Sequence, residues 1–134
     1  VYGIALKQKK VLLCQERISG LDMLKFPGGG LEFGEGLTDG LKREIFEESG
    51  IQSTVKSHFY TTDFFVQSAF KSNEQLISVY FIVDLHDDVS GVKMQLSPSH
   101  DIQFFWEDLT PQLEKRMTFP VDRLVIRKLV QASQ

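Results

Sequence analysis

A run of glycines followed by a short helical pattern is the feature that most constrains this chain. Pro27 and the glycines 28–30 can continue neither a helix nor a central strand, so they mark a loop. The pattern then becomes that of a helix of about three turns, with Thr38 as the candidate N-cap and Gly50 at the place of a C-terminal glycine cap. The sequence therefore predicts a helix over Thr38–Ser49, entered from a loop with few side chains.

Three glutamates share one face of this predicted helix. Residues three and four positions apart are neighbours on a helix, so the carboxylates of Glu44, Glu47 and Glu48 are expected to reach a common point. A solvated acidic face, eased by pairs such as Arg43 with Glu47, is the simpler explanation. An apolar stripe beside the glutamates nevertheless indicates packing there, and partly buried carboxylates require protons or cations. Oxygen ligands of this kind suit hard cations, Mg²⁺ above all.

The rest of the chain has the pattern of strands with two further helices. Runs rich in β-branched and aromatic residues predict two hairpins and one more strand. In order, these are VYGIAL with VLLCQER, His58–Phe70 with Gln75–Leu85, and IQFFWEDL. A short helix is expected at Thr110 and Pro111, and an amphipathic helix over Val121–Val130. The intervening ISGLDMLKFPGGG and DDVSGVKMQLSPSHD are expected to be loops, and the mixture predicts an α+β or a layered α/β/α domain.

Length and charge narrow the class of protein. The 134 residues, without repeats or a long linker, predict a single domain over residues 1–134. No apolar run approaches the roughly 20 residues of a membrane helix, and a net charge of −3 gives no basic surface for duplex nucleic acid. An acidic protein that handles phosphates is expected to use metal ions for that purpose.

The single cysteine and the N-terminal sequence indicate in which cellular compartment the protein works. Cys14 lies among strand-like residues and has no partner for a disulfide, which fits a reducing environment. Val1 begins strand-like sequence with no feature of a secretory signal, and we expect an initiator methionine to precede it. The sequence therefore predicts a cytoplasmic protein.

Nine residues of the loop and helix follow a fixed spacing. They fit the pattern Gly-x5-Glu-x7-Arg-Glu-U-x-Glu-Glu-x-Gly-U, in which U is a bulky aliphatic residue. The residues are Gly29, Glu35, Arg43, Glu44, Ile45, Glu47, Glu48, Gly50 and Ile51. This pattern resembles the signature of the Nudix hydrolase family, and the preceding Phe26-Pro27-Gly28 is similar to its usual approach to the motif. No fixed position departs from the signature. Asp39-Gly40 stands where the family more often has alanines, and Gly40 is expected to cost the helix about 1 kcal/mol relative to alanine.

The resemblance implies a fold and an activity. The fold is an α/β/α sandwich with a mixed β-sheet between helices, here with Thr38–Ser49 on one face and Val121–Val130 on the other. The activity is hydrolysis of a nucleoside diphosphate linked to another group X, by attack of metal-activated water on phosphorus, with Mg²⁺ or Mn²⁺ as cofactor.

The resemblance also assigns roles to the motif residues. Glu47 and Glu48 are the main metal ligands, joined by a backbone carbonyl of the glycine loop at Gly28 or Gly29, where a diphosphate can also approach closely. Glu44 is a further ligand or the general base.

Two motif residues have open roles. Arg43 orients Glu44 or a neighbouring carboxylate, and Glu35 holds the loop against the helix or reaches a metal through water. For both, a purely structural role is equally open.

Two acids outside the motif are further candidates for contact with substrate or metal. Family members often supply an extra acid from a distant loop, which makes Asp101 a candidate, although an ordinary loop-capping role fits as well. The segment TFPVDRLVIRKL resembles mutator-type members, in which a residue near the start of the last helix reads a purine base. Asp122 stands there, and its alternative role is the N-cap of that helix.

These features favour a nucleoside triphosphate or related nucleotide as substrate. Members active on ADP-ribose carry a proline after the motif, and this chain has none between Pro27 and Pro98. Nucleotide sugars and dinucleoside polyphosphates remain alternatives, as does a module that senses nucleotides without catalysis. A homodimer is compatible with the sequence.

Overall fold

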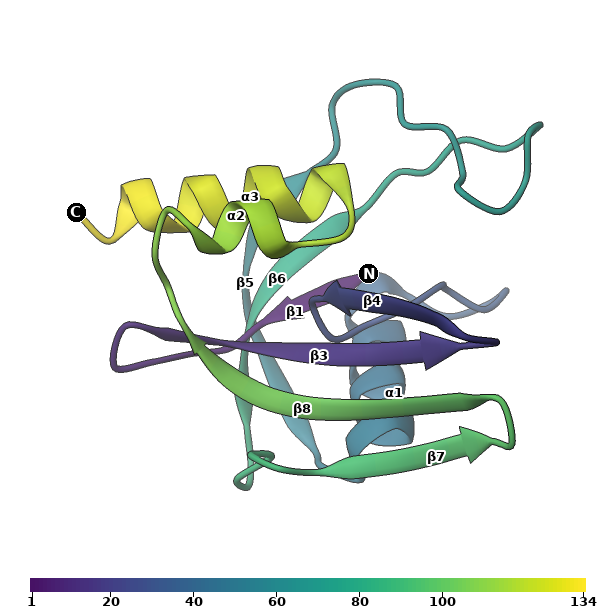
Figure 1. Ribbon diagram of the computed structural model, residues 1–134, viewed down its shortest axis with the longest axis horizontal. Helices are drawn as coiled ribbons and strands as arrows, with labels where there is room; N and C mark the ends of the chain where they lie inside the picture. Colours follow the sequence, from purple (N-terminus) through teal and green to yellow (C-terminus); the bar gives the residue numbers. More distant parts are fainter.

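The computed structural model describes residues 1–134 as eight strands and three helices (Figure 1). The strands are β1 (Tyr2–Ile4), β2 (Leu6–Lys7), β3 (Lys10–Ile18), β4 (Leu21–Lys25), β5 (Ser53–Thr61), β6 (Val79–Leu85), β7 (Lys93–Ser97) and β8 (His100–Asp108). The helices are α1 (Leu37–Ser49), α2 (Leu113–Arg116) and α3 (Pro120–Ala132). None of the helices combines the length and the apolar character that a membrane span requires.

The strands form two sheets instead of one mixed sheet. The larger sheet has the order β2-β3-β8-β7, and β4 pairs with the end of β3. The smaller sheet has the order β1-β6-β5, in which β1 is parallel to β6 and β5 is antiparallel to it. The α/β class is confirmed.

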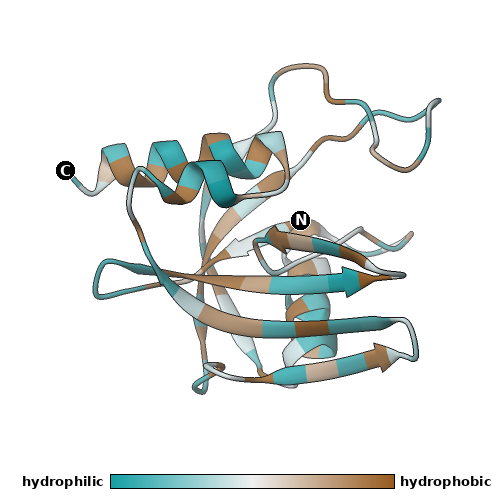
Figure 2. Cartoon of the chain, viewed as in Figure 1, coloured by the Kyte–Doolittle hydropathy of each residue, from teal (hydrophilic) through white to brown (hydrophobic).

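The larger sheet lies between α1 and α3, as predicted (Figure 1). Successive side chains of a strand point to opposite faces. In β3, Val11 and Leu13 belong to a core cluster with α3, whereas Leu12 and Cys14 belong to a second cluster with α1. Figure 2 shows the corresponding apolar residues along β3 and β8.

The boundaries of α1 follow from glycines at both ends. Gly36 is the N-cap residue and no side chain caps the helix, so the predicted Thr38 cap was wrong. At the other end, Gly50 adopts a left-handed conformation with φ of 75°, as predicted, and its N–H donates to the Phe46 carbonyl at 2.7 Å.

Gly40, where the family more often has alanine, has a packing role. A Cβ at this position would lie 2.4 Å from Cδ2 of Leu31 and 2.9 Å from Oε1 of Glu35. The loop that precedes α1 crosses the helix at this point, so glycine allows the two segments to approach closely.

For the first 25 residues, one prediction is confirmed only in part and another was wrong. In the predicted opening hairpin, only Leu6 and Lys7 pair with β3, and β1 pairs with β6 instead. Leu21–Lys25, predicted as loop, forms β4 after a tight turn in which Ser19 and Gly20 have positive φ. Pro27 and the glycines 28–30 do form a loop, but this loop begins only after Lys25.

The later strands also differ from the prediction. The β5–β6 hairpin is confirmed, but its strands are shorter, and residues 62–78 form a loop that projects from the body of the protein (Figure 1). Lys93–Ser97 forms β7 within a stretch predicted as loop. The short helix after Pro111 is confirmed as α2, and the last helix as α3.

Candidate active site

A pocket of about 540 Å³ lies beside α1 and is walled by β3, β4 and the glycine loop. Fifteen residues from these and neighbouring segments line it. They are Tyr2, Glu16, Ile18, Met23, Lys25, Gly28, Gly29, Gly30, Glu44, Glu47, Glu48, Phe70, Leu96, His100 and Phe119. The pocket thus brings together the three predicted glutamates and the glycine loop.

Arg43 organises the acidic side of this site. Its guanidinium donates two bonds to Glu35, Nε at 2.9 Å and Nη2 at 2.6 Å. Nη1 donates to Glu44 at 3.1 Å and to Glu47 at 3.2 Å, and Nη2 also reaches the Gly30 carbonyl at 3.0 Å. Arg43 therefore ties the loop to two of the three glutamates, and the bonds from Arg43 hold the pKa of Glu35 at about 2.

The three glutamates differ in their surroundings. The side chain of Glu47 is 54% exposed and that of Glu44 is 16% exposed. Glu48 is buried, and its Oε2 has no hydrogen-bond partner in the protein. Burial raises the pKa of Glu48 to about 8; Lys25 opposes this shift, and Glu16 and Glu44 reinforce it.

The glycine loop approaches both α1 and β1 closely. A Cβ at Gly29 would lie 2.6 Å from the carboxyl carbon of Glu44. Gly28 has φ of 142°, and a Cβ there would lie 2.1 Å from the Val1 carbonyl oxygen. Gly28 therefore requires glycine, and at Gly29 a side chain would displace the carboxylate of Glu44.

Three polar residues that the sequence analysis missed, Glu16, Lys25 and His100, complete the pocket. Lys25 is buried, and its Nζ donates to Glu16 at 3.0 Å and to the Gly28 carbonyl at 3.2 Å. The other carboxylate oxygen of Glu16 is bonded to Nε2 of His100. No local signal singled out Glu16 or Lys25, because Gln15, Arg17 and Asp22 in the same segments are also polar.

Asp101 does not line this pocket. It lies in β8 rather than in the predicted loop, its side chain is exposed, and it faces a shallow hollow formed with β7. Its neighbour His100 lines the acidic pocket instead.

Asp122 lines an adjoining apolar pocket of about 320 Å³. This pocket shares Tyr2, Phe70 and Phe119 with the acidic one. The N-cap role was wrong: the N-cap residue is Phe119, and the buried carboxylate of Asp122 accepts a hydrogen bond from the Tyr80 hydroxyl. Burial raises the pKa of Asp122 to about 6, opposed by the Tyr80 bond.

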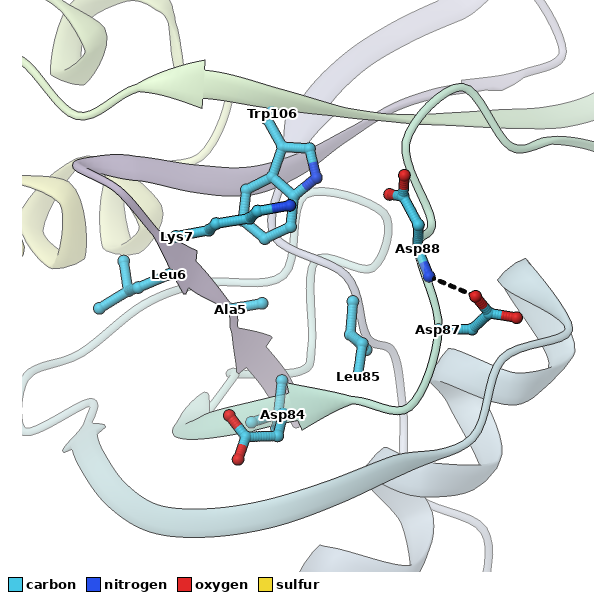
Figure 3. Close-up of a pocket in the computed structure, with 9 residues that line it drawn as sticks. Ala5, Leu6, Lys7, Asp84, Leu85, Asp87, Asp88 and Trp106 are labelled. Atoms are coloured by element: carbon cyan, nitrogen blue, oxygen red, sulfur yellow. Dashed lines mark hydrogen bonds between the residues drawn. The ribbon is translucent and has the colours of Figure 1, made fainter.

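A further hollow of about 460 Å³ lies between β2, the end of β6 and β8 (Figure 3). Its lining includes Asp84, Asp87, Asp88 and Trp106, with Nζ of Lys7 lying 6.0 Å from the Trp106 ring centre. None of the predicted site residues lines it.

The acidic pocket has the donor set of a hard divalent cation. Its candidate ligands are carboxylate and carbonyl oxygens, and the buried, unpartnered Oε2 of Glu48 requires a proton or a cation. The predicted common point is not formed: no group of three or more His, Cys, Asp or Glu side chains is arranged to hold a metal ion. Instead, the guanidinium of Arg43 donates hydrogen bonds to the carboxylates of Glu44 and Glu47.

We expect the metal-free protein to lose stability as the pH rises from about 4.5 towards 8. The pKa of Glu48 in the folded protein is above that of an exposed glutamate, so the folded protein retains a proton that the unfolded chain has released. Each rise in pH within this range therefore favours unfolding, by a total on the order of a few kcal/mol. Urea unfolding at about pH 5 and about pH 8 measures the effect, and Glu48→Gln should reduce it. Equal pH dependence in the two proteins would contradict this account.

Comparison with known proteins places the chain in a family context. A family model of the NUDIX domain matches residues 1–128. The mouse (Mus musculus) protein named nucleoside diphosphate-linked moiety X motif 6 is 47% identical over 49 residues, which are 37% of this chain and 16% of that protein. The 8-oxo-dGTP diphosphatase of Buchnera aphidicola is 41% identical over 54 residues, which are 39% of this chain and 42% of that protein. The chain therefore spans less than half the length of these relatives.

Solved structures share the fold at lower sequence identity. A NUDIX hydrolase from Nitrosomonas europaea superimposes with a TM-score of 0.75 at 18% identity, covering 98% of this chain and 86% of that one. The ORF135 protein of E. coli gives a TM-score of 0.71 at 21% identity, covering 97% and 86%.

Proposed function

The chain belongs to the NUDIX domain family, and on that premise we propose that it is a metal-dependent hydrolase that cleaves a pyrophosphate bond in a nucleoside diphosphate linked to X. One observation carries the proposal: a buried glutamate with an unpartnered carboxylate oxygen shares a pocket with an open glycine loop and two further glutamates. A polyanionic substrate can enter such an acidic pocket only with cations that neutralise the charge.

Glu44, Glu47, Glu48 and the Gly28 carbonyl would hold Mg²⁺ or Mn²⁺, which would neutralise the diphosphate and lower the pKa of a bound water. The Gly28 carbonyl accepts one bond from Lys25 and keeps a second lone pair. Glu47 is well exposed, so its bond to Arg43 is weak and it is free to turn towards a cation.

The other residues of the site position the substrate and move a proton. Arg43 and Glu35 fix the loop against α1, and Gly29 lets the diphosphate approach the backbone. Glu44, held by Arg43, is placed to accept the proton of the attacking water where it is not itself a ligand. This division gives a role to each of the charged residues of the motif.

The favoured substrate is a nucleoside triphosphate. The adjoining apolar pocket offers aromatic side chains and a buried carboxylate for a base, and it connects with the acidic pocket through shared residues. One relative of this chain is named an 8-oxo-dGTP diphosphatase, which supports a purine triphosphate in particular.

A product screen with Mg²⁺ and with Mn²⁺ tests this proposal. The substrates are nucleoside triphosphates, ADP-ribose, dinucleoside polyphosphates and nucleotide sugars, and products are separated by chromatography. We expect triphosphates to give a nucleoside monophosphate and pyrophosphate. Preferred cleavage of another class would reassign the substrate, and binding without any cleavage would favour a sensing module.

We expect Asp122→Asn to change the choice between purine and pyrimidine nucleotides. The variant keeps one oxygen to accept the bond from the Tyr80 hydroxyl. An NH2 group replaces the other carboxylate oxygen, so this position can donate a hydrogen bond to the base but can no longer accept one from it. A lost hydrogen bond to the base costs about 1–3 kcal/mol, which corresponds to a rise in KM for purines of roughly 5- to 150-fold. Measuring KM on one purine and one pyrimidine nucleotide, together with the melting temperature, decides the role. Equal losses on both bases would argue against base reading by Asp122.

A further inference from the structure

The pairing of β3 with β8 places His100 in the candidate active site. His100 lies opposite Ile18, and both line the acidic pocket together with Glu16. The adjacent pair, Arg17 and Asp101, belongs to the opposite face of the sheet. His100 is 28% exposed, so its ring is accessible from the pocket.

Glu16 fixes the orientation of the His100 ring. Burial raises the pKa of Glu16, but Lys25 and His100 outweigh this and leave the pKa below its usual value. An ionised carboxylate only accepts hydrogen bonds, so the His100 nitrogen that contacts it, Nε2, carries the hydrogen. The other ring nitrogen, Nδ1, is left for a ligand, as when a carboxylate orients a histidine in other sites.

His100 is also the available basic group of the pocket. Among the lining residues only Lys25 and His100 are basic. The ammonium of Lys25 is buried and already bonded to Glu16 and to the Gly28 carbonyl. A phosphate that enters the pocket therefore meets His100 as the basic side chain with a free nitrogen.

We propose that His100, oriented by Glu16 and Lys25, binds the phosphate chain of the substrate through Nδ1. The inference rests on the proposed function, because it adds a substrate contact to the same pocket. The imidazole in its protonated form donates from both nitrogens, one to Glu16 and one to a phosphate oxygen. His100 then acts from the strand side of the pocket, across from the glutamates of α1.

Binding of inorganic pyrophosphate in the presence of Mg²⁺ tests this contact without turnover. Calorimetry compares the unsubstituted protein with His100→Ala, which should weaken pyrophosphate binding about tenfold or more. The matched control is His86→Ala, which removes an exposed imidazole bonded to Thr54 outside both pockets and should leave binding unchanged. Equal affinity of His100→Ala and the unsubstituted protein would overturn the inference.

Two conservative variants separate substrate contact from support of Glu16. In His100→Asn the amide nitrogen takes the place of Nδ1, which faces the phosphate. In His100→Gln the amide nitrogen takes the place of Nε2, which contacts Glu16. If His100 binds phosphate, His100→Asn retains more pyrophosphate affinity than His100→Gln; the reverse order means that the ring only supports Glu16 and overturns the inference.

The same measurements keep the two proposals separate. If the protein binds pyrophosphate with His100 dependence but cleaves no nucleotide, the proposed function fails and the contact stands. If it cleaves nucleotides but His100→Ala changes neither KM nor pyrophosphate affinity, the contact fails and the function stands.

Discussion

Glu48→Gln is expected to lower kcat by about a thousandfold while leaving the protein folded. Glu48 combines burial with a carboxylate oxygen that no protein group satisfies, so it depends on a cation more than Glu44 or Glu47 does. A bound cation stabilises the negative charge that develops at the phosphate in the transition state, and loss of a ligand to the cation removes several kcal/mol of this stabilisation. Each 1.36 kcal/mol added to the activation free energy lowers the rate tenfold. Affinity for Mg²⁺ and Mn²⁺, measured by calorimetry, should fall with it, and Glu47→Gln should act in the same direction.

The stability of the same variant separates this role from a structural one. Without metal, Glu48→Gln should be at least as stable as the unsubstituted protein at about pH 8, because it removes a charge from a buried, acidic place. Asp39→Asn is the control, since it removes an exposed carboxylate from the same helix outside the pocket and should leave kcat and metal affinity unchanged. Unchanged metal affinity in Glu48→Gln would exclude Glu48 as a ligand.

The sequence was most informative where structure is local. The helical repeat and the glycine spacing lie within residues 28–51, and in the structure they form one loop and one helix with nearly the predicted bounds. Side chains at i, i+3 and i+4 share a face in any helix, so the position of the glutamates needed no knowledge of the rest of the fold. Their arrangement was less predictable, because Nη1 of Arg43 bonds both Glu44 and Glu47, whereas Glu48 is buried apart from it.

The strand side of the pocket depends on long-range pairing. Glu16, Lys25 and His100 lie on β3, β4 and β8, and 84 residues separate Glu16 from His100. Only the register of these strands brings the three side chains together, and a shift of one residue would turn His100 outwards and Asp101 inwards. Asp101 was chosen because the predicted strand began only at Ile102, so the alternation of faces was not applied to His100 and Asp101.

The predicted single sheet failed for a related reason. Tyr2–Ile4 looked like the first arm of a hairpin, since an apolar run and a turn precede β3. The chain instead crosses to β6 and pairs with it in parallel, a contact between residues almost 80 positions apart. Local patterns identify strands but not their partners, so the division into two sheets required the structure.

Lys25→Met is expected to reduce the free energy of unfolding by about 3–5 kcal/mol, the cost of removing one partner from a buried ion pair. The side chains of Lys25 and Glu16 are 10% and 7% exposed, and their charged atoms lie 3.0 Å apart. Burial alone lowers the pKa of Lys25, but the acidic groups around it, including Cys14, Glu48 and Glu16, outweigh burial and raise the pKa above its usual value. The ammonium is therefore charged, and its removal leaves the buried carboxylate of Glu16 without its ammonium partner.

Two further variants identify the ion pair as the source of that loss. Lys25→Met combined with Glu16→Gln should recover most of the stability, because the second substitution removes the charge that the first left unpaired while keeping a hydrogen-bonding group for His100. Lys10→Met removes a lysine of the same sheet whose pair with Asp108 is well exposed, and should cost less than about 1 kcal/mol. Urea unfolding with constant m-values measures all three. If Lys25→Met cost no more than Lys10→Met, the ammonium would not be the counter-charge that lets this pocket hold buried carboxylates before a metal binds.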